Sequence, residues 1–199
     1  MSLSASVLSG LIKNNLITTG GANGSNLQKF CDAVAQGIVV SIVGSTFETN
    51  DSGLTSNNGI GTGIGIAGLS SSSMTTTALS NMSSTGSNAL NLMQSIMDAT
   101  VQHLSTAASL SSTDSTVYSG TGIIIIGSIS VTTSNMYNNI NNSLLSSGAN
   151  GINRENLSHA IATGIVTNIL SSGTGTLTIT GSPAPPFSPS TDVGTGTIS

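Results

Sequence analysis

The sequence is short of charged residues. Three basic and seven acidic residues make up only 5% of the 199-residue chain, against about 25% in an ordinary soluble domain. Three basic side chains are too few for binding driven by phosphate contacts, which excludes nucleic-acid binding as a main role. A net charge of −4 is ordinary, but so few charges leave a wide neutral surface. Such a surface loses little on desolvation against a partner, so we interpret it as surface buried in an assembly.

Cysteines, long apolar runs and an export signal are also scarce or missing. The single cysteine, Cys31, excludes an internal disulfide framework. The longest apolar run, around 123–126, is far shorter than the roughly 20 residues of a membrane helix. No basic segment precedes an apolar one near the N-terminus, which argues against an ordinary signal peptide. We therefore expect synthesis in a cytoplasm, without Sec export, and no membrane partner.

Residues that carry chemistry are few and scattered. Residues 63–68 match GxGxxG, but a dinucleotide site would need a following helix and an acidic residue about 20 positions on. His103 and His159 lie beside apolar stripes and lack the spacing of a metal site or catalytic triad, so we expect solvated or interface histidines. Cys31 lies within an apolar stripe and is predicted to be a small buried hydrophobe. The sequence therefore predicts no enzyme, no cofactor, no metal site and no small-molecule substrate.

Apolar periodicity is present along most of the chain. With 37% apolar residues and a mean hydropathy of +0.27, the chain is too hydrophobic for a disordered linker. Apolar residues recur at i, i+3, i+4 and i+7 in three long segments, which predicts amphipathic helices. These segments begin at Leu27, Leu90 and Leu157. A shorter helix is expected before each of them, over residues 3–16, 74–84 and 135–146.

Turn and capping signals separate the expected helices. The sequence GANG occurs at 21–24 and again at 148–151, between a short and a long helix. Ser25 and Gln28 have the spacing of a capping box, and Asn153 is placed as the N-cap of the third long helix. The unit is thus a short helix, a Gly/Asn turn and a long helix.

A Gly-Thr-Gly motif follows each long helix. It begins at Gly61, Gly120 and Gly173, and again at Gly194 in a truncated form. β-Branched residues follow the glycines, which predicts strands that need cover on both faces. The candidate sheet and interface positions are Gly61, Gly63, Gly120, Gly122, Ile123, Ile125, Gly173, Gly175, Gly194 and Gly196.

These patterns together predict an α+β fold of three tandem helix-turn-helix-strand repeats, with the long helices packed on a small β-sheet. The repeats are expected at residues 1–69, 70–134 and 135–182. Residues 183–199 are expected to form an extended, Pro-rich C-terminal arm with a terminal strand. The arm positions are Pro183, Pro185, Pro186, Phe187 and Pro189. Two destinations stay open for the arm: the sheet of a neighbouring subunit or its own chain.

Three segments carry a resemblance to a known class of proteins. The opening MSLSASVLSGLIKNNL, the helix LQKFCDAVAQGIVVSIV and the ending GTGTIS resemble small virion-associated structural proteins of tailed bacteriophages. The resemblance covers one repeat unit at a time and implies no catalytic residues. It implies a virion component made in the host cytoplasm, whose partners are copies of itself and other virion structural proteins.

We therefore expect a structural or assembly protein of the tail, neck or baseplate, which acts as a homo-oligomer through subunit contacts. A capsid decoration protein is one alternative. A cell-surface or secreted lattice or adhesin subunit is the other, since it shares the Ser/Thr/Gly bias.

Overall fold

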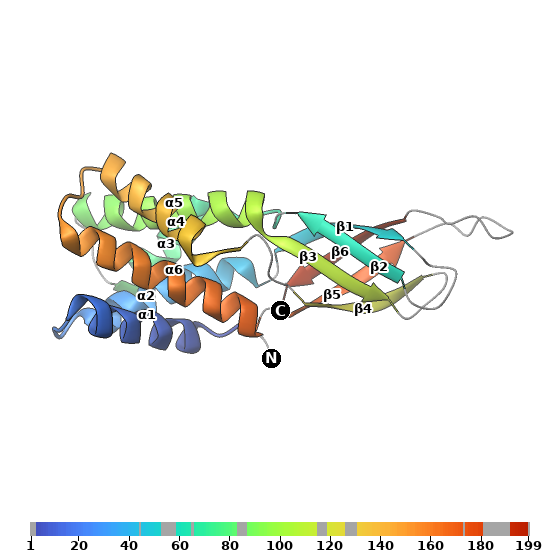
Figure 1. Cartoon of the computed structure of the whole chain (residues 1–199), viewed down its shortest axis with the longest axis horizontal. Coiled ribbons are helices and arrows are strands. Elements are labelled where there is room, and N and C mark those ends of the chain that lie inside the picture. The colour runs from blue at the N-terminus through green and yellow to red at the C-terminus, as the bar shows by residue number, and fades with distance from the viewer. Residues whose placement is uncertain are drawn as a thin grey trace, which may run out of the picture.

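The molecule is elongated, with helices at one end and strands at the other (Figure 1). The computed structural model describes residues 3–43, 45–52, 59–64, 66–82, 87–114, 119–125, 131–172, 174–180 and 192–198. In the strands it describes the backbone; in the helices and their connections it also describes side chains.

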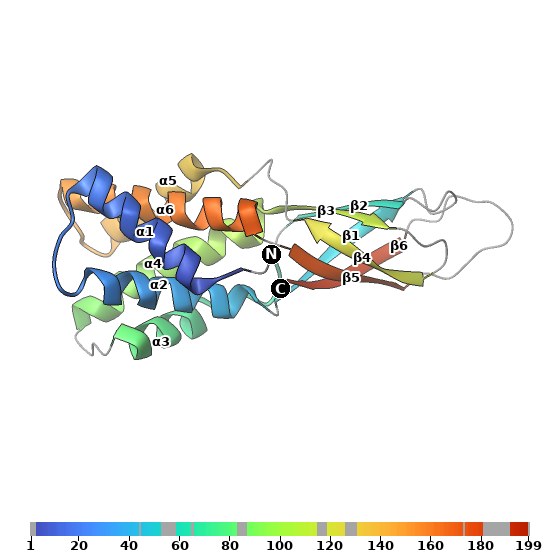
Figure 2. The same ribbon diagram turned by 90° about the horizontal axis from the view of Figure 1, so that it is seen from below.

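The described helices form a closed ring in chain order. They are α1 (Ala5–Gly20), α2 (Leu27–Ile42), α3 (Ser71–Met82), α4 (Ser87–Ala107), α5 (Thr133–Ser146) and α6 (Ile152–Ser172). Each helix packs against the next one in the chain, and α6 packs against α1. The ring consists of three antiparallel helix pairs, as the two perpendicular views show (Figures 1 and 2).

The first helix of each pair buries one narrow stripe of apolar side chains. The stripes have four-residue spacing, so each lies along one face of its helix. In α1 the buried apolar residues are Leu8, Ile12 and Leu16; in α5 they are Met136, Ile140 and Leu144; in α3 they are Met74 and Ala78. The second helix of each pair is buried over a wider arc.

A hydroxyl residue precedes the first helix of every pair, and it accepts a capping hydrogen bond in α3 and α5, whereas Ser4 before α1 makes no such bond. Ser70 Oγ accepts from Ser73 N at 3.3 Å, and Thr132 Oγ1 accepts from Asn135 N at 3.3 Å. Ser4, Ser70 and Thr132 each also lie within 3.5 Å of the hydroxyl of the serine two residues on. The residue just before each of them, Leu3, Leu69 and Val131, packs into the core. A buried or half-buried apolar residue before a hydroxyl residue therefore recurs at three equivalent places around the ring.

Small residues let neighbouring helices approach closely. A Cβ added to Gly37 of α2 would lie 2.7 Å from Met74 O of α3, and one added to Gly164 of α6 would lie 2.7 Å from Ile12 Cγ1 of α1. Both distances are below any real Cβ contact. Ala99, also buried, lies at a similar place along α4. The middle of α2 and the middle of α6 are thus narrow on the side that meets the next short helix.

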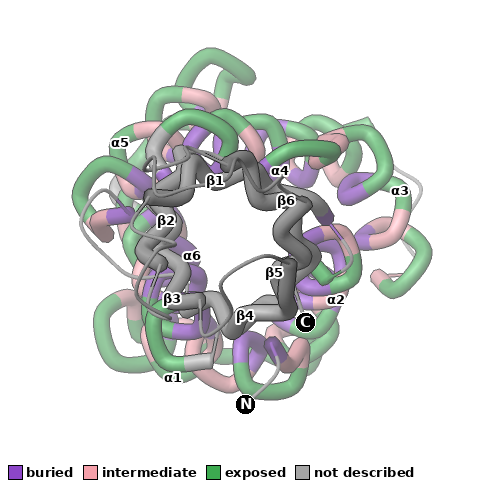
Figure 3. Tube along the Cα trace, turned by 90° about the vertical axis from the view of Figure 1, so that its right-hand side faces the viewer, coloured by how far each residue is buried: buried purple, intermediate pink, exposed green. Residues whose placement is uncertain are grey.

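A pair of antiparallel strands follows each long helix. The strands are β1 (Thr46–Ser52), β2 (Gly59–Ile64), β3 (Ser109–Asp114), β4 (Ser119–Ile125), β5 (Thr174–Thr180) and β6 (Asp192–Ile198). Each pairs antiparallel with the next, and β6 pairs with β1 from Thr46 opposite Thr197 to Asp51 opposite Asp192. The backbone therefore closes into a six-stranded barrel, which is seen end-on in Figure 3.

The predicted α+β fold, with long helices packed on a small β-sheet, is wrong. The part of the chain whose side chains the structure describes is a bundle of six helices, 81% helical and without a strand. The helices bury their apolar faces against one another, and the strands continue beyond the end of the bundle (Figure 1). An apolar stripe shows that a helix is covered, but it does not show whether a sheet or another helix covers it.

Candidate functional site

The predicted Gly-Thr-Gly positions lie in four strands of the barrel. Gly61 and Gly63 are in β2, Gly120, Gly122, Ile123 and Ile125 in β4, Gly175 in β5, and Gly194 and Gly196 in β6. Gly173 lies outside the described residues. By element order β6 corresponds to β2 and β4, since each is the second strand after a long helix. The truncated motif that begins at Gly194 is therefore equivalent to the motifs that begin at Gly61 and Gly120. The repeat boundaries at residues 69, 134 and 182 stay a prediction.

The predicted arm ends in a strand that pairs within its own chain. β6 is hydrogen-bonded to β5 on one side and to β1 on the other. Among the described strands each has a neighbour on both sides, and a closed barrel offers no edge for strand addition. The arm positions Pro183, Pro185, Pro186, Phe187 and Pro189 lie outside the described residues.

The GxGxxG segment connects the barrel to the bundle. It begins in the last two residues of β2 and runs toward α3. All strand pairings of the barrel are antiparallel, whereas a dinucleotide fingerprint belongs to a parallel βαβ unit. Ile66, within the segment, is 2% exposed, and its N–H donates to Leu104 O of α4 at 3.1 Å. The described part of this segment is therefore held in the core, at the point where the chain passes from the barrel to the bundle.

The two histidines differ in environment, and one of them was predicted wrongly. His103 is not solvated: only 2% of it is exposed, in the last turns of α4, and its Nε2 has no partner among the described residues. Burial lowers the pKa of this imidazole below its ordinary value. His159 on α6 is exposed, and its ring lies 6.0 Å from that of Tyr137 on α5. The His159 Nδ1 lies 3.4 Å from the Thr163 hydroxyl one turn along the same helix.

Cys31 is fully buried in α2, as its place in the apolar stripe predicts. Desolvation by burial, reinforced by the nearby charge of Asp32, raises the pKa of the thiol to about 11. At neutral pH the side chain is therefore a protonated thiol, which is a poor nucleophile and metal ligand. In the described part of the chain, no three His, Cys, Asp or Glu residues gather as a metal site would require.

A polar cluster joins α1 to α2. Ser9 Oγ donates to Asp32 Oδ1 at 2.6 Å, and Gln28 Nε2 donates to the same oxygen at 2.8 Å. Lys13 Nζ donates to Gln28 Oε1 at 2.8 Å. The predicted capping box is therefore wrong, because the Gln28 amide is engaged between the two helices and α2 begins at Leu27, after Asn26.

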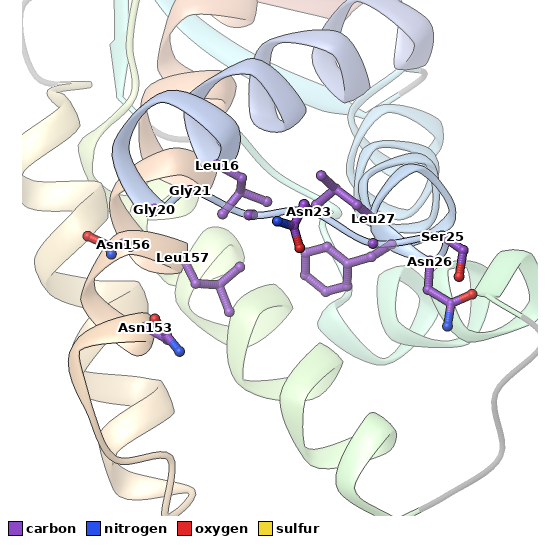
Figure 4. A pocket seen from close by; sticks show the side chains of 13 residues that line it. Leu16, Gly20, Gly21, Asn23, Ser25, Asn26, Leu27, Asn153, Asn156 and Leu157 are labelled. Carbon is purple, nitrogen blue, oxygen red and sulfur yellow. The ribbon is translucent and has the colours of Figure 1, made fainter.

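A pocket lies at the end of the bundle away from the barrel (Figure 1). It has a volume of about 750 Å³ and is bounded by the turn between α1 and α2 and by the first turns of α6 (Figure 4). The two sides are far apart in the sequence but meet where α1 packs on α6: a Cβ on Gly20 would lie 3.3 Å from the Asn156 Cβ. Gly21 and Gly24 turn the chain around this rim with φ of 60° and 139°, values that favour glycine.

The lining of the pocket is apolar below and amide-rich around the rim. Leu16, Leu27, Phe30 and Leu157 supply apolar surface, and all the described residues of the lining are uncharged. Asn23 and Asn26 come from the turn, and Asn153 and Asn156 from α6 (Figure 4). Asn153 was predicted to be an N-cap, but α6 begins one residue earlier, at Ile152. No sequence pattern predicts this pocket, because its two sides, at residues 16–30 and 153–157, are far apart in the chain.

Comparison of the chain with protein-family models, curated proteins and solved structures gives no match. None of the described helices has the length and apolar content needed to cross a membrane.

Proposed function

We propose that this chain is a virion structural protein of a tailed bacteriophage, which acts by contacts with other subunits in the tail, neck or baseplate. The observation that carries the proposal is the three-fold recurrence of helix pairs around the long axis, in a chain with 5% charged residues. One chain thereby offers three similar, nearly neutral faces. Such faces match a neighbour that itself has three copies around an axis.

The exposed part of the bundle is consistent with this role. Several large apolar side chains are more than 40% exposed and are distributed over α1, α2, α4, α5 and α6. Neutral hydroxyl and amide side chains surround them. Removing such surface from water requires no ion to lose its hydration.

Quantitative mass spectrometry of gradient-purified particles tests the proposal. The expected result is that the chain co-purifies with the particles, with one copy for every three copies of a protein that cross-links to it. Absence from particles, with recovery from the cell surface or the medium, would contradict the proposal and favour a surface lattice or adhesin subunit. That alternative rests on the same Ser/Thr/Gly-rich composition.

A further inference from the structure

We propose that the pocket between the α1–α2 turn and the start of α6 is a binding site for a neutral saccharide. This inference goes beyond the proposed function and does not depend on it. It rests on three features of the pocket: the charge of its lining, the state of its amides, and its shape.

The charge of the lining restricts the class of ligand. All the described lining residues are uncharged, so phosphate, carboxylate and ammonium groups would enter without a counter-charge. Burying an unpaired ion is costly, and a ligand that depends on such a group is therefore disfavoured. A neutral ligand loses nothing by the absence of charge.

The amides of the rim are free to bind a ligand. The side chains of Asn23, Asn26, Asn153 and Asn156 make no hydrogen bond with any described residue. Each presents an acceptor oxygen and an NH₂ donor. Sugar hydroxyls both donate and accept, so an amide can satisfy two neighbouring hydroxyls at once. Hydrogen-bond partners of this kind give orientation and specificity inside a pocket.

The apolar side chains below the rim fit the carbon-bearing face of a sugar ring. Leu157 projects toward the turn that carries Asn23 (Figure 4), and Leu16, Leu27 and the half-buried Phe30 complete the apolar surface. An aromatic ring supplies a flat, rigid contact surface at low entropic cost. The volume of about 750 Å³ lies within the range of small-molecule sites, and is ample for a disaccharide.

The chain contains an internal control for the rim. The sequence GANG occurs twice, at 21–24 and 148–151, and Asn23 and Asn150 occupy the same place in the two turns. Asn23 lines the pocket without a partner. Asn150 is outside the pocket, and its Nδ2 donates to Gly148 O at 3.1 Å. Substitution of either asparagine changes the same local sequence, but only one substitution alters the pocket.

Calorimetric titration of the full chain with neutral disaccharides (N,N′-diacetylchitobiose, maltose and lactose) tests the site. We expect at least one to bind with a Kd of about 1 mM or tighter. Asn23→Ala and Asn156→Ala should each weaken binding roughly tenfold, whereas Asn150→Ala should leave it unchanged. Thermal unfolding of the three variants, all altered at exposed or half-exposed positions, verifies that they fold.

Three results would overturn the proposal. The first is that none of these disaccharides binds the intact chain. The second is that Asn150→Ala weakens binding as much as Asn23→Ala does. The third is that sialyllactose, which carries a carboxylate, binds more tightly than lactose. None of these results affects the copy number measured in particles, so the saccharide site and the proposed function fail or stand separately.

Discussion

A Cβ added to Gly164 of α6 would lie 2.7 Å from Ile12 Cγ1 of α1, so the last helix of the described bundle rests directly on the first. The same added atom would lie 3.3 Å from Ile12 N. Because the backbone of α1 lies behind the Ile12 side chain, α1 has little freedom to move away from an added atom on α6. This contact closes the ring of helices.

Gly164→Ala is therefore expected to lower the free energy of unfolding by about 1–3 kcal/mol, through overpacking. The loss should appear although alanine is the better helix former. Gly10→Ala is the matched control, since a Cβ there meets nothing within 4 Å, and it should raise stability by about 0.5–1 kcal/mol. Urea unfolding of the two variants measures both effects. Equal midpoints for the two would contradict the close contact between α1 and α6.

Ser9→Ala tests the polar link between α1 and α2. Ser9 is buried and donates to Asp32 Oδ1 at 2.6 Å, so its loss should cost about 1–2 kcal/mol. Ser6→Ala, on the exposed side of the same helix, should change stability by less than about 0.5 kcal/mol. Both variants make the same Ser→Ala change in α1, so the difference between their chemical denaturation curves separates the loss of the Ser9 hydrogen bonding from the change in helix propensity. If Ser9→Ala matched Ser6→Ala, the link would have no energetic role.

The buried imidazole of His103 makes stability depend on pH. Burial lowers its pKa below the ordinary value of 6.5, so below that pH the unfolded chain binds a proton that the folded chain does not. The free energy of unfolding should therefore fall as the pH falls, with a slope of at most about 1.4 kcal/mol per pH unit. The decline should continue until the pH reaches the folded-state pKa.

Denaturation of the wild type and of one variant between about pH 7.5 and 5.5 measures this slope. His103→Leu should flatten it, because leucine binds no proton in either state. If the free energy of unfolding of His103→Leu fell with pH as steeply as that of the wild type, the proton would belong to another group. His103→Ala should itself be destabilising, because truncation at a buried position leaves a cavity.

Cys31 offers a readout of opening of the bundle. Its thiol is fully buried and its pKa is raised to about 11, so at pH 8 the native chain should react with a thiol reagent at least about tenfold more slowly than the urea-unfolded chain. The folded-state thiolate becomes populated only as the pH approaches 11. Reaction of the native chain at the unfolded rate would place Cys31 outside the core.

The sequence predicts the helices far better than it predicts their partners. Three apolar stripes locate α2, α4 and α6, because helical periodicity is a local property. Which element packs on those stripes is not a local property of the sequence. For that reason the six-helix bundle was not predicted. After the third long helix the Gly-Thr-Gly motif occurs twice, at Gly173 and at Gly194, because the chain is rich in Gly and Thr. The motif alone therefore does not identify which of the two strands is equivalent to β2 and β4.

The polar residues were the least predictable. Gln28 and Asn153 both have the identity and spacing of capping residues, yet one joins two helices and the other lines the pocket. A side chain with several hydrogen-bonding options is assigned by its neighbours in space. The hydroxyl caps at Ser70 and Thr132 show the opposite case, in which the whole interaction lies within four residues.

Because the helices form a closed ring and the strands a closed barrel, the packing of these elements does not depend on which connection is open. Helix α1 begins and strand β6 ends near the junction of bundle and barrel (Figure 2), and α1 and α6 pack as closely as helices joined by a turn. By element order, the connections from β2 to α3 and from β4 to α5 correspond to the break between β6 and α1. A circular permutant cut at either connection, with the present ends joined by a short linker, would thus retain every helix neighbour and every strand ladder.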